Sequence, residues 1–387
     1  MLLLIAIAIL IGVLFSNYFK RIIVFQYLLS VIVLVLLIKF IIFDIRHPDK
    51  WIGQPDNIEQ VVFKKKPNIY LIQPDGYASS DELKRGYYNF DNSKFESYLT
   101  DNNFKIYNDF RSNYYSTLSS NSSLFAMKHH YYNFPRNRIR EVYNARDVIV
   151  GDNPVLNILK VNNYKSYLLM DKSYMLINRP HISYDYCNMR IEDIGYFSRG
   201  FVLDYDVFAD LKKIDLNDDK PKFFFLEQLL PSHITNKPNP GDIAENERVK
   251  YLLNLEKAND WLKQVIDYII ENDDNPLIII AADHGGFVGL NSTYEDRIKQ
   301  EDRDIIYSIF SSQLAIKWPE KAPEYDSKIK TSVNLFRILF TYLSENKVYL
   351  NNLQEDVSYI QIEKGAPFGV YEYIDENGEI VFNKLTK

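Results

Sequence analysis

Three apolar runs of this chain end in residues that could bind a metal ion. "NIYLIQP" is followed by Asp75, "KFFFLEQLLPS" by His233, and "LIIIAA" by Asp283 and His284. If these runs are parallel strands, their carboxyl ends meet at one edge of a sheet, where α/β proteins bind ligands. Aspartate oxygens and histidine nitrogens together suit a borderline divalent ion such as zinc or manganese. The sequence therefore indicates a candidate metal site.

Each of these motifs also has an ordinary structural explanation. Asp283 could cap a following helix, Asp75 with Gly76 could form an Asx turn, and His233 could lie in a surface loop. The joint occurrence of carboxylates and imidazoles after three strands favours a shared site over three unrelated turns.

A hydroxyl-rich segment could supply a nucleophile. "NYYSTLSSNSSLFAMKHH", residues 113–130, begins a predicted helix with Ser116 and Thr117 at its start. The positive potential of a helix N-terminus favours an alkoxide and a bound phosphate, and a metal ion would lower the pKa of the hydroxyl further. The alternative is simple N-capping by Ser116 or Thr117.

The elements that would position these residues alternate as in an α/β protein. Apolar runs of strand length and longer amphipathic stretches follow one another, which predicts a mostly parallel sheet flanked by helices. The predicted strands are 68–73, 165–170, 222–229, 277–282 and 312–318, and the predicted helices are 91–102, 117–130, 153–163, 244–271 and 331–344. A hairpin, "YEYIDENGEIVFN", is predicted near the C-terminus as an edge addition to this sheet.

Composition and charge exclude several classes of function. The 387 residues carry a net charge of -6, and no long basic stretch lies beyond the N-terminal region, so we expect no nucleic-acid partner. The single cysteine, Cys187, excludes an intrachain disulfide and a multi-cysteine zinc site.

The first 43 residues are almost continuously apolar. Two uncharged runs flank Lys20 and Arg21 and predict two transmembrane helices within residues 1–43. A signal peptide is the alternative for the first run, but a charged leader and a small-residue cleavage site are missing. We expect a polar juxtamembrane linker at 44–66 and one large domain at 67–387.

Charges beside the apolar runs bear on the topology. Lys20 and Arg21 favour a cytoplasmic loop, which would place the large domain outside the cell and make the chain multi-pass. Lys39, Arg46 and the lysines at 64–66 favour the opposite orientation.

Four motifs in this order resemble the alkaline phosphatase superfamily: "PNIYLIQPDGY", "NYYSTLSS" at the head of a helix, "PSH" after a strand, and "IIIAADHGG". The likeness covers roughly residues 67–345 and is greatest to the sulfatase-like branch that contains the lipoteichoic acid synthases and other membrane-anchored phosphoglycerol transferases. It implies the alkaline-phosphatase-like α/β fold, with a central, mostly parallel sheet flanked by helices.

The resemblance also implies roles for single residues. Asp75, Asp283 and His284 would hold one divalent metal ion, with Mn²⁺ preferred and Zn²⁺ or Mg²⁺ as alternatives. Thr117 would complete the coordination as the covalent nucleophile, and His233 would contact the substrate phosphate.

Other residues near the nucleophile remain open. A shift of register would make Ser116, Ser119 or Ser120 the nucleophile instead of Thr117. Arg111 and Asn113, just ahead of it, could bind substrate phosphate, since arginine offers a bidentate fork and asparagine a neutral donor; the alternative for Arg111 is a solvated surface position.

The chain departs from the family pattern at several points. Gly286 stands where a glutamate commonly follows the "DHG" motif, and Asp75 stands where the lipoteichoic acid synthases have a glutamate. No histidine follows His284, which favours one metal over two. Cys187 is followed by Asn-Met-Arg, so the C/S-x-P-x-R motif of true sulfatases is missing and sulfate ester hydrolysis is not expected.

These inferences predict an enzyme of phosphoryl transfer. We expect a membrane-anchored transferase that moves a phosphoglycerol-type group from a membrane phospholipid to a cell-surface glycan through a phospho-threonine intermediate. The alternatives are a phosphodiesterase or phosphatase with water as acceptor, and a catalytically inactive membrane scaffold that keeps the fold.

Overall fold

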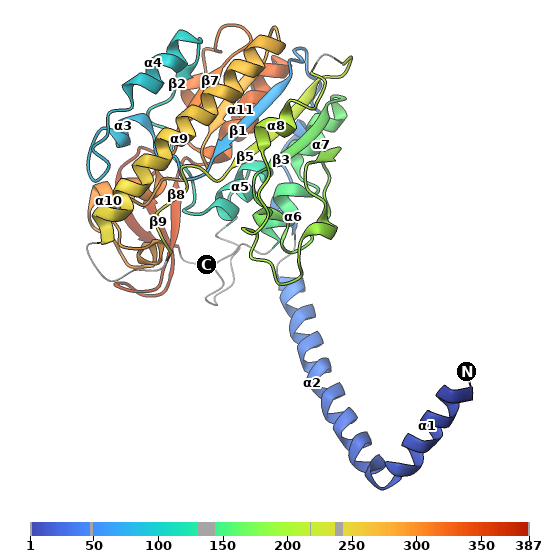
Figure 1. Cartoon of the computed structure of the whole chain (residues 1–387). Coiled ribbons are helices and arrows are strands. Elements are labelled where there is room, and N and C mark those ends of the chain that lie inside the picture. Colours follow the sequence, from blue (N-terminus) through green and yellow to red (C-terminus); the bar gives the residue numbers. More distant parts are fainter. Residues whose placement is uncertain (1, 47–48, 131–143, 217, 237–242, 386–387) are drawn as a thin grey trace. The chain divides into compact units, whose positions relative to one another are not determined.

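The computed structural model describes residues 2–46, 49–130, 144–216, 218–236 and 243–385 (Figure 1). The chain separates into two compact units, Met1–Lys50 and Trp51–Lys387. The first unit is helical and the second is an α/β domain.

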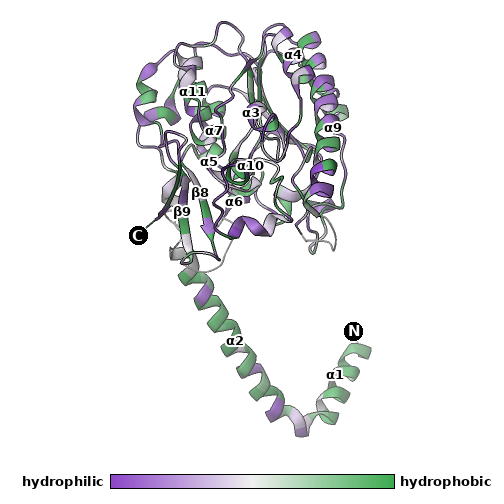
Figure 2. Ribbon diagram, turned by 90° about the vertical axis from the view of Figure 1, so that its left-hand side faces the viewer, coloured by the Kyte–Doolittle hydropathy of each residue, from purple (hydrophilic) through white to green (hydrophobic). Residues whose placement is uncertain are grey.

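The N-terminal unit contains two apolar helices of unequal length. Helix α2 (Phe19–Arg46) belongs to a segment, Ser16–Ile42, that is long and apolar enough to cross a membrane, and Figure 2 shows it as almost continuously hydrophobic. Helix α1 (Leu2–Leu14) has 13 residues, about 20 Å at 1.5 Å per residue, whereas a bilayer core is about 30 Å thick. Of the two predicted spans, one is therefore supported, and the multi-pass prediction is not.

The domain is built on a seven-stranded mixed sheet with the order β2-β7-β6-β1-β5-β3-β4. The central strands β6, β1, β5, β3 and β4 run parallel, whereas β7 runs antiparallel to β6 and β2. The bounds are β1 Ile69–Pro74, β2 Lys105–Ile106, β3 Lys165–Met170, β4 Tyr186–Cys187, β5 Lys222–Gln228, β6 Leu277–Ala281 and β7 Leu314–Lys317. All five strands predicted from the sequence are present, and the mostly parallel α/β architecture is confirmed.

Alternating aromatic side chains of β5 show how the sheet separates two layers of helices. Phe225 packs against α5, and Phe223 packs against α11. Phe224 faces the other side, where it stacks on Tyr70 at 4.8 Å between ring centroids. The Tyr70 hydroxyl donates a hydrogen bond to Asp273, directly after α9. Figure 1 shows α9, α4 and α8 on that second face. Both faces are covered, which explains why the strands read as continuous apolar runs.

The helices agree closely with the predicted amphipathic stretches. The five predicted helices appear as α4 Ser93–Asp101, α5 Thr117–Ala126, α7 Pro154–Val161, α9 Ile243–Asn272 and α11 Ser332–Ser344. Four shorter helices accompany them: α3 Ser80–Leu83, α6 Ala145–Val150, α8 Val207–Leu211 and α10 Arg303–Phe310. Helix α5 ends earlier than predicted because Met127 adopts a left-handed conformation.

The C-terminal hairpin forms, but it does not extend the main sheet. Strands β9 (Gly369–Ile374) and β10 (Ile380–Lys384) pair with β8 (Ser358–Ile362) in a separate antiparallel sheet. The prediction of an edge addition was wrong because β8, which the sequence analysis did not identify, provides the pairing edge.

Residues 51–66, predicted as part of a linker, pack against the domain. Arg337 of α11 is almost fully buried and bonds to Asp56 at 2.7 Å and to Gln54 at 2.7 Å. The Phe63 amide donates to Asn162 at 2.6 Å, and the Phe63 ring packs on Phe340. This stretch is polar in composition yet ordered by tertiary contacts.

Candidate metal centre

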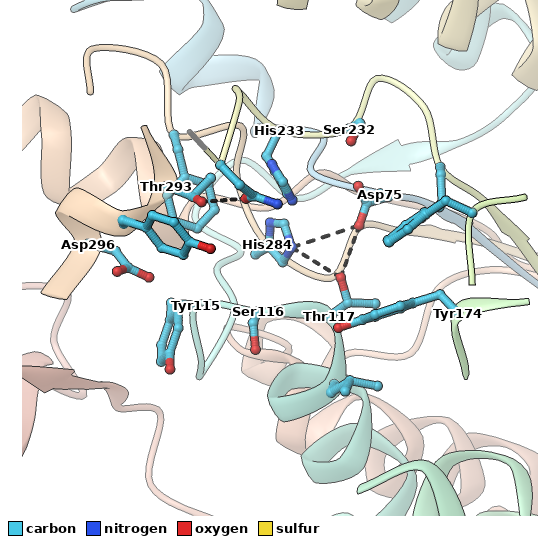
Figure 3. A pocket seen from close by; sticks show the side chains of 16 residues that line it. Asp75, Tyr115, Ser116, Thr117, Tyr174, Ser232, His233, His284, Thr293 and Asp296 are labelled. Atoms are coloured by element: carbon cyan, nitrogen blue, oxygen red, sulfur yellow. Dashed lines mark hydrogen bonds and ion pairs between the residues drawn. The ribbon is translucent and has the colours of Figure 1, made fainter. Parts of the chain in front are cut away.

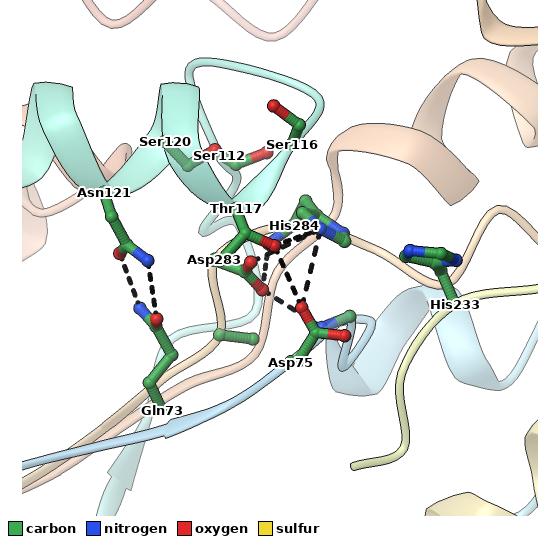
Figure 4. A network of polar contacts seen from close by, with 12 residues as sticks. Gln73, Asp75, Ser112, Ser116, Thr117, Ser120, Asn121, His233, Asp283 and His284 are labelled. Atoms are coloured by element: carbon green, nitrogen blue, oxygen red, sulfur yellow. Dashed lines mark hydrogen bonds and ion pairs between the residues drawn. The ribbon is translucent and has the colours of Figure 1, made fainter. Parts of the chain in front are cut away.

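Four side chains from three elements converge at the carboxyl edge of the main sheet (Figure 4). Asp75 follows β1, Asp283 and His284 follow β6, and Thr117 is the first residue of α5. The Thr117 hydroxyl donates to Asp75 Oδ1 at 3.0 Å and lies 3.3 Å from His284 Nε2. All four side chains are buried.

Backbone contacts orient the side chains of Asp283 and His284. Asp283 Oδ1 accepts hydrogen bonds from the amides of Gly76 and His284, both at 3.0 Å, whereas Oδ2 is buried and has no hydrogen-bond partner among the described residues. His284 Nδ1 bonds to the Gly285 carbonyl at 2.8 Å, so this nitrogen carries the proton and Nε2 presents its lone pair. Such contacts commonly fix the tautomer of metal-binding histidines.

The donor set fits a divalent metal ion. One ligand atom each from Asp75, Asp283 and His284 lie within 4.8 Å of one another, and the orphaned Asp283 Oδ2 is only 3.3 Å from His284 Nε2. A cation bound here would satisfy that oxygen and would supply Lewis acidity and charge neutralisation. Carboxylates with one imidazole suit Mn²⁺ or Zn²⁺, and both ions are among those that the sequence predicted.

The pKa shifts of Asp283 and His284 point the same way. Burial raises the pKa of Asp283 to about 6, Asp75 adds to this shift, and His284 opposes it. Burial opposes protonation of His284, but the nearby Asp283 and Asp75 outweigh it and raise its pKa above the ordinary value. The crowded anionic site therefore favours bound protons, which a metal ion would displace.

Two further buried carboxylates lie near the site and were missed by the sequence analysis. Both carboxylate oxygens of Glu227, in β5, are buried with no hydrogen-bond partner among the described residues. Burial, with Asp171, Asp75 and Asp283 nearby, raises the pKa of Glu227 well above its usual range, and burial raises that of Asp171 to about 7. The available signal was a glutamate inside the apolar strand "KFFFLEQ".

Among the hydroxyls of the helix start, Thr117 is the one that contacts the candidate ligands. Ser116 and Ser119 bond to each other at 2.7 Å, and Ser120 donates to the Tyr114 carbonyl at 2.9 Å. Ser116 makes no capping bond with its side chain, and the first amides of an α-helix have no acceptor inside the helix. These amides are positioned to bind an anion beside Thr117.

Buried polar contacts hold α5 in place. Gln73 of β1 and Asn121 of α5 exchange two amide hydrogen bonds, at 2.8 and 2.7 Å (Figure 4). His130 bonds to the Ser119 carbonyl at 2.9 Å, and its ring stacks on Tyr114 at 4.1 Å between centroids. This histidine, for which the sequence suggested no role, supports the helix that carries the nucleophile candidate.

A cavity of about 490 Å³ opens over the site (Figure 3). Asp75, Thr117, His284 and His233 line it together with aromatic side chains. His233 Nδ1 bonds to the Ile234 carbonyl at 2.6 Å, which leaves Nε2 as the free nitrogen, and burial lowers the pKa of this imidazole. His233 is thus a neutral group at the cavity wall, 6.0 Å from the His284 ring between centroids.

Arg111 and Asn113 do not reach this cavity. The Asn113 side chain is fully buried and bonds to Val357, Ser332 and Val333. Arg111 is also buried, and its guanidinium bonds to the carbonyls of Asp356 and Asp375 while it lines a different cavity. Instead of contacting the site, both residues tie the segment before Thr117 to the C-terminal part of the domain.

Tyr251 occupies the space beside Gly286. A Cβ added to Gly286 would lie 2.2 Å from the Tyr251 ring. The Tyr251 hydroxyl donates to the Gly76 carbonyl at 2.9 Å and accepts from the Ala78 amide at 3.2 Å. A tyrosine of α9 therefore braces the turn after Asp75, and the glycine is required for it to fit.

Comparison with solved structures identifies the fold. The C-terminal periplasmic domain of EptC from Escherichia coli matches with a TM-score of 0.53 and 15% identity over 83% of this chain and 97% of that chain. Its zinc complex matches with a TM-score of 0.51 and 15% identity over 81% and 93%. The lipoteichoic acid synthase LtaP from Listeria monocytogenes matches with a TM-score of 0.53 and 13% identity over 84% and 91%. No known sequence family and no curated protein sequence matches the chain.

Proposed function

We propose that this chain, which has the alkaline phosphatase/sulfatase-like fold, is a membrane-anchored, metal-dependent phosphoryl transferase with Thr117 as its nucleophile. The observation that carries the proposal is the buried Thr117 hydroxyl at the start of α5, within 3.3 Å of both a carboxylate and an imidazole of the candidate metal centre. The donor would be a phosphoglycerol-type phospholipid and the acceptor a cell-surface glycan.

The residues of the cavity could carry out two successive displacements. In the first, the Thr117 oxygen bonds to phosphorus while the bond from phosphorus to the lipid glyceride oxygen breaks, and the proton of the Thr117 hydroxyl leaves on the glyceride as diacylglycerol. In the second, the oxygen of an acceptor hydroxyl bonds to phosphorus while the bond from phosphorus to the Thr117 oxygen breaks, and the proton of the acceptor restores the Thr117 hydroxyl. We assign to His233, which lines the cavity as a neutral imidazole, contact with the phosphoryl group and acceptance of the proton of the incoming hydroxyl. Its Nδ1 bond to the Ile234 carbonyl and its lowered pKa support this role.

The lining of the cavity supports dependence on a metal ion. No lysine or arginine is among the described residues that line it. Neutralisation of a phosphodiester would therefore depend on a cation held by Asp75, Asp283 and His284 and on the first amides of α5.

The N-terminal helix supports the choice of a lipid donor. One apolar helix of spanning length serves as an anchor or as a signal segment, and we propose that α2 is an anchor. Lys20 and Arg21 at its N-terminal end would lie in the cytoplasm and the domain outside the membrane. An anchored domain works beside a membrane-resident donor.

Trapping of the intermediate tests the proposal. Full-length protein supplied with Mn²⁺ or Zn²⁺ should become labelled at Thr117 by a head-group-labelled phosphatidylglycerol, as mapped by mass spectrometry. Thr117→Ala should abolish labelling, whereas Ser120→Ala, which loses only a bond to the Tyr114 carbonyl, should retain it. Full turnover in Thr117→Ala without any labelled residue would refute the proposal, and equal turnover without a glycan acceptor would identify a hydrolase.

A further inference from the structure

An exposed aromatic loop lies between β4 and α8. We call residues 195–202 the aromatic loop. Its side chains of Tyr196, Phe197 and Val202 are 81%, 101% and 83% exposed, more than any other large hydrophobic residue in the described part of the domain. Exposed hydrophobic residues scattered singly are ordinary, but a contiguous cluster usually marks a site of interaction.

The aromatic loop has a defined conformation that presents these side chains outward. The Ser198 amide donates to the Gly195 carbonyl at 2.9 Å, and the Gly200 amide donates to the Ser198 hydroxyl at 3.0 Å. Gly200 has φ +87, and a Cβ there would lie 2.5 Å from the Tyr174 Cα, so only glycine allows this close approach. The Arg179 guanidinium lies 4.1 Å from the centroid of the Tyr196 ring.

The aromatic loop is continuous with the cavity over the candidate metal centre. Phe201 is 55% exposed and stacks on Tyr174 with 5.4 Å between ring centroids. Phe201 and Tyr174 both line the cavity that contains Thr117, and Figure 3 shows the Tyr174 ring beside the Thr117 side chain. The aromatic loop therefore contributes one of its own side chains to the wall of the cavity that contains the nucleophile candidate.

We propose that the aromatic loop inserts its tip into the interfacial region of the bilayer that anchors the chain, and so brings the cavity to the head group of a membrane lipid. Tyr, Phe and Arg are the residue types that the interface accommodates, and Arg199 is exposed on the same loop. A bilayer is favoured over a protein partner because Phe201 of the same loop lines the cavity where we propose that the head group of a membrane lipid reacts. The role of insertion in bringing the cavity to a lipid head group rests on the proposed function. Insertion itself can be measured without any enzymatic turnover.

Depth-dependent quenching tests insertion on the full chain in nanodiscs that contain phosphatidylglycerol. In a Cys187→Ser background, a fluorophore is attached at Phe197→Cys or, as the matched control, at Leu253→Cys, where the side chain is 55% exposed on α9. Acyl-chain nitroxide lipids should quench the label at 197 and not at 253, with the same result in a Thr117→Ala chain. Equal quenching at both positions would overturn the proposal. Energy transfer between labelled copies without lipid quenching would do so as well, and would identify a second copy as the occupant.

A second variant separates this proposal from the proposed function. Phe197→Ser with Val202→Ser should lower turnover of a bilayer donor by about tenfold, because burial of one such side chain is worth that factor or more. Turnover of a water-soluble short-chain donor should not change. An equal loss with both donors would overturn the proposal. Quenching at position 197 in a chain that turns over neither donor would support the aromatic loop and refute the proposed function.

Discussion

The two carboxylate oxygens of Asp283 have different surroundings in the site. Oδ1 accepts hydrogen bonds from two backbone amides, and the buried Oδ2 has no hydrogen-bond partner in the part of the chain that the structure describes. Asp283→Asn keeps the size and the Oδ1 acceptor but removes the charge, so we expect Mn²⁺ to bind at least about 100-fold more weakly, as titrated by electron paramagnetic resonance. Asp193→Asn, on the exposed surface and paired with Arg190, is the control. Unchanged affinity in Asp283→Asn would place the metal ion elsewhere.

Gly286 shows how a neighbouring side chain can require a glycine. Gly286→Ala would push the added Cβ against the Tyr251 ring and disturb the turn after Asp75, at a cost of about 1–3 kcal/mol. We expect a lower thermal midpoint and weaker metal binding. Gly195→Ala, where an added Cβ meets nothing within 4 Å, should change neither. If Gly286→Ala matched this control, Tyr251 would not be bracing the site.

Helix α5 owes its position to contacts from distant parts of the chain. The Gln73–Asn121 pair joins it to the sheet, and His130 joins its first turn to the segment that follows the helix. His129, next in the same segment, bonds to the Tyr114 hydroxyl at 3.1 Å and to the Glu355 carbonyl at 2.8 Å. The alignment of Thr117 with Asp75 is therefore a property of the packed helix rather than of its own sequence.

These two histidines predict a dependence of stability on pH. Burial lowers the pKa of His129 to about 4 and that of His130 to about 3, whereas the unfolded chain titrates near about 6.5. Between these values the unfolded chain binds more protons, so their contribution is complete above about pH 6.5 and is lost as the pH falls, by up to about 1.4 kcal/mol per pH unit for each group. The denaturant midpoint of His129→Gln/His130→Gln should fall less steeply from pH 6.5 to 4, although it starts lower. If the denaturant midpoint of the parent chain fell equally steeply with pH, the prediction would be contradicted.

The domain as a whole begins before the boundary that composition suggests. Removal of residues 51–66 would leave Arg337 buried without Asp56, and an unpaired buried charge costs about 3–5 kcal/mol. We expect a chain that starts at Trp51 to fold and one that starts at Pro67 to aggregate or to melt at a much lower temperature, as measured by scanning fluorimetry. Asp56→Asn in the longer chain isolates the ion pair. Equal melting of the two truncated chains would show that residues 51–66 are only a linker.

Local pattern was sufficient for much of the architecture. The buried strands are continuous apolar runs and the longest helix has a clear apolar face, because burial on one or two sides imposes those periods on any sequence that folds this way. The order of the four motifs led to the alkaline-phosphatase-like fold, and the same resemblance named Asp75, Thr117, Asp283 and His284 together. The ends of the strands by themselves indicated only a shared site for Asp75, Asp283 and the two histidines His233 and His284.

Other features depend on residues far apart in the chain, and the sequence alone did not determine them. The hydroxyls of Ser116 and Thr117, at the start of α5, differ in the direction in which they point. The packing of α5 on β1 directs the Thr117 hydroxyl toward Asp75. Arg111 and Asn113 precede the nucleophile candidate, yet their side chains bond elsewhere. The carbonyls of Asp356 and Asp375 are the partners of Arg111, and Val357 with the start of α11 supplies those of Asn113, away from the cavity. Sequence determined which residue types stand at the ends of the strands. Only the tertiary structure decided which of them meet, because side-chain contacts depend on packing between elements rather than on neighbours along the chain.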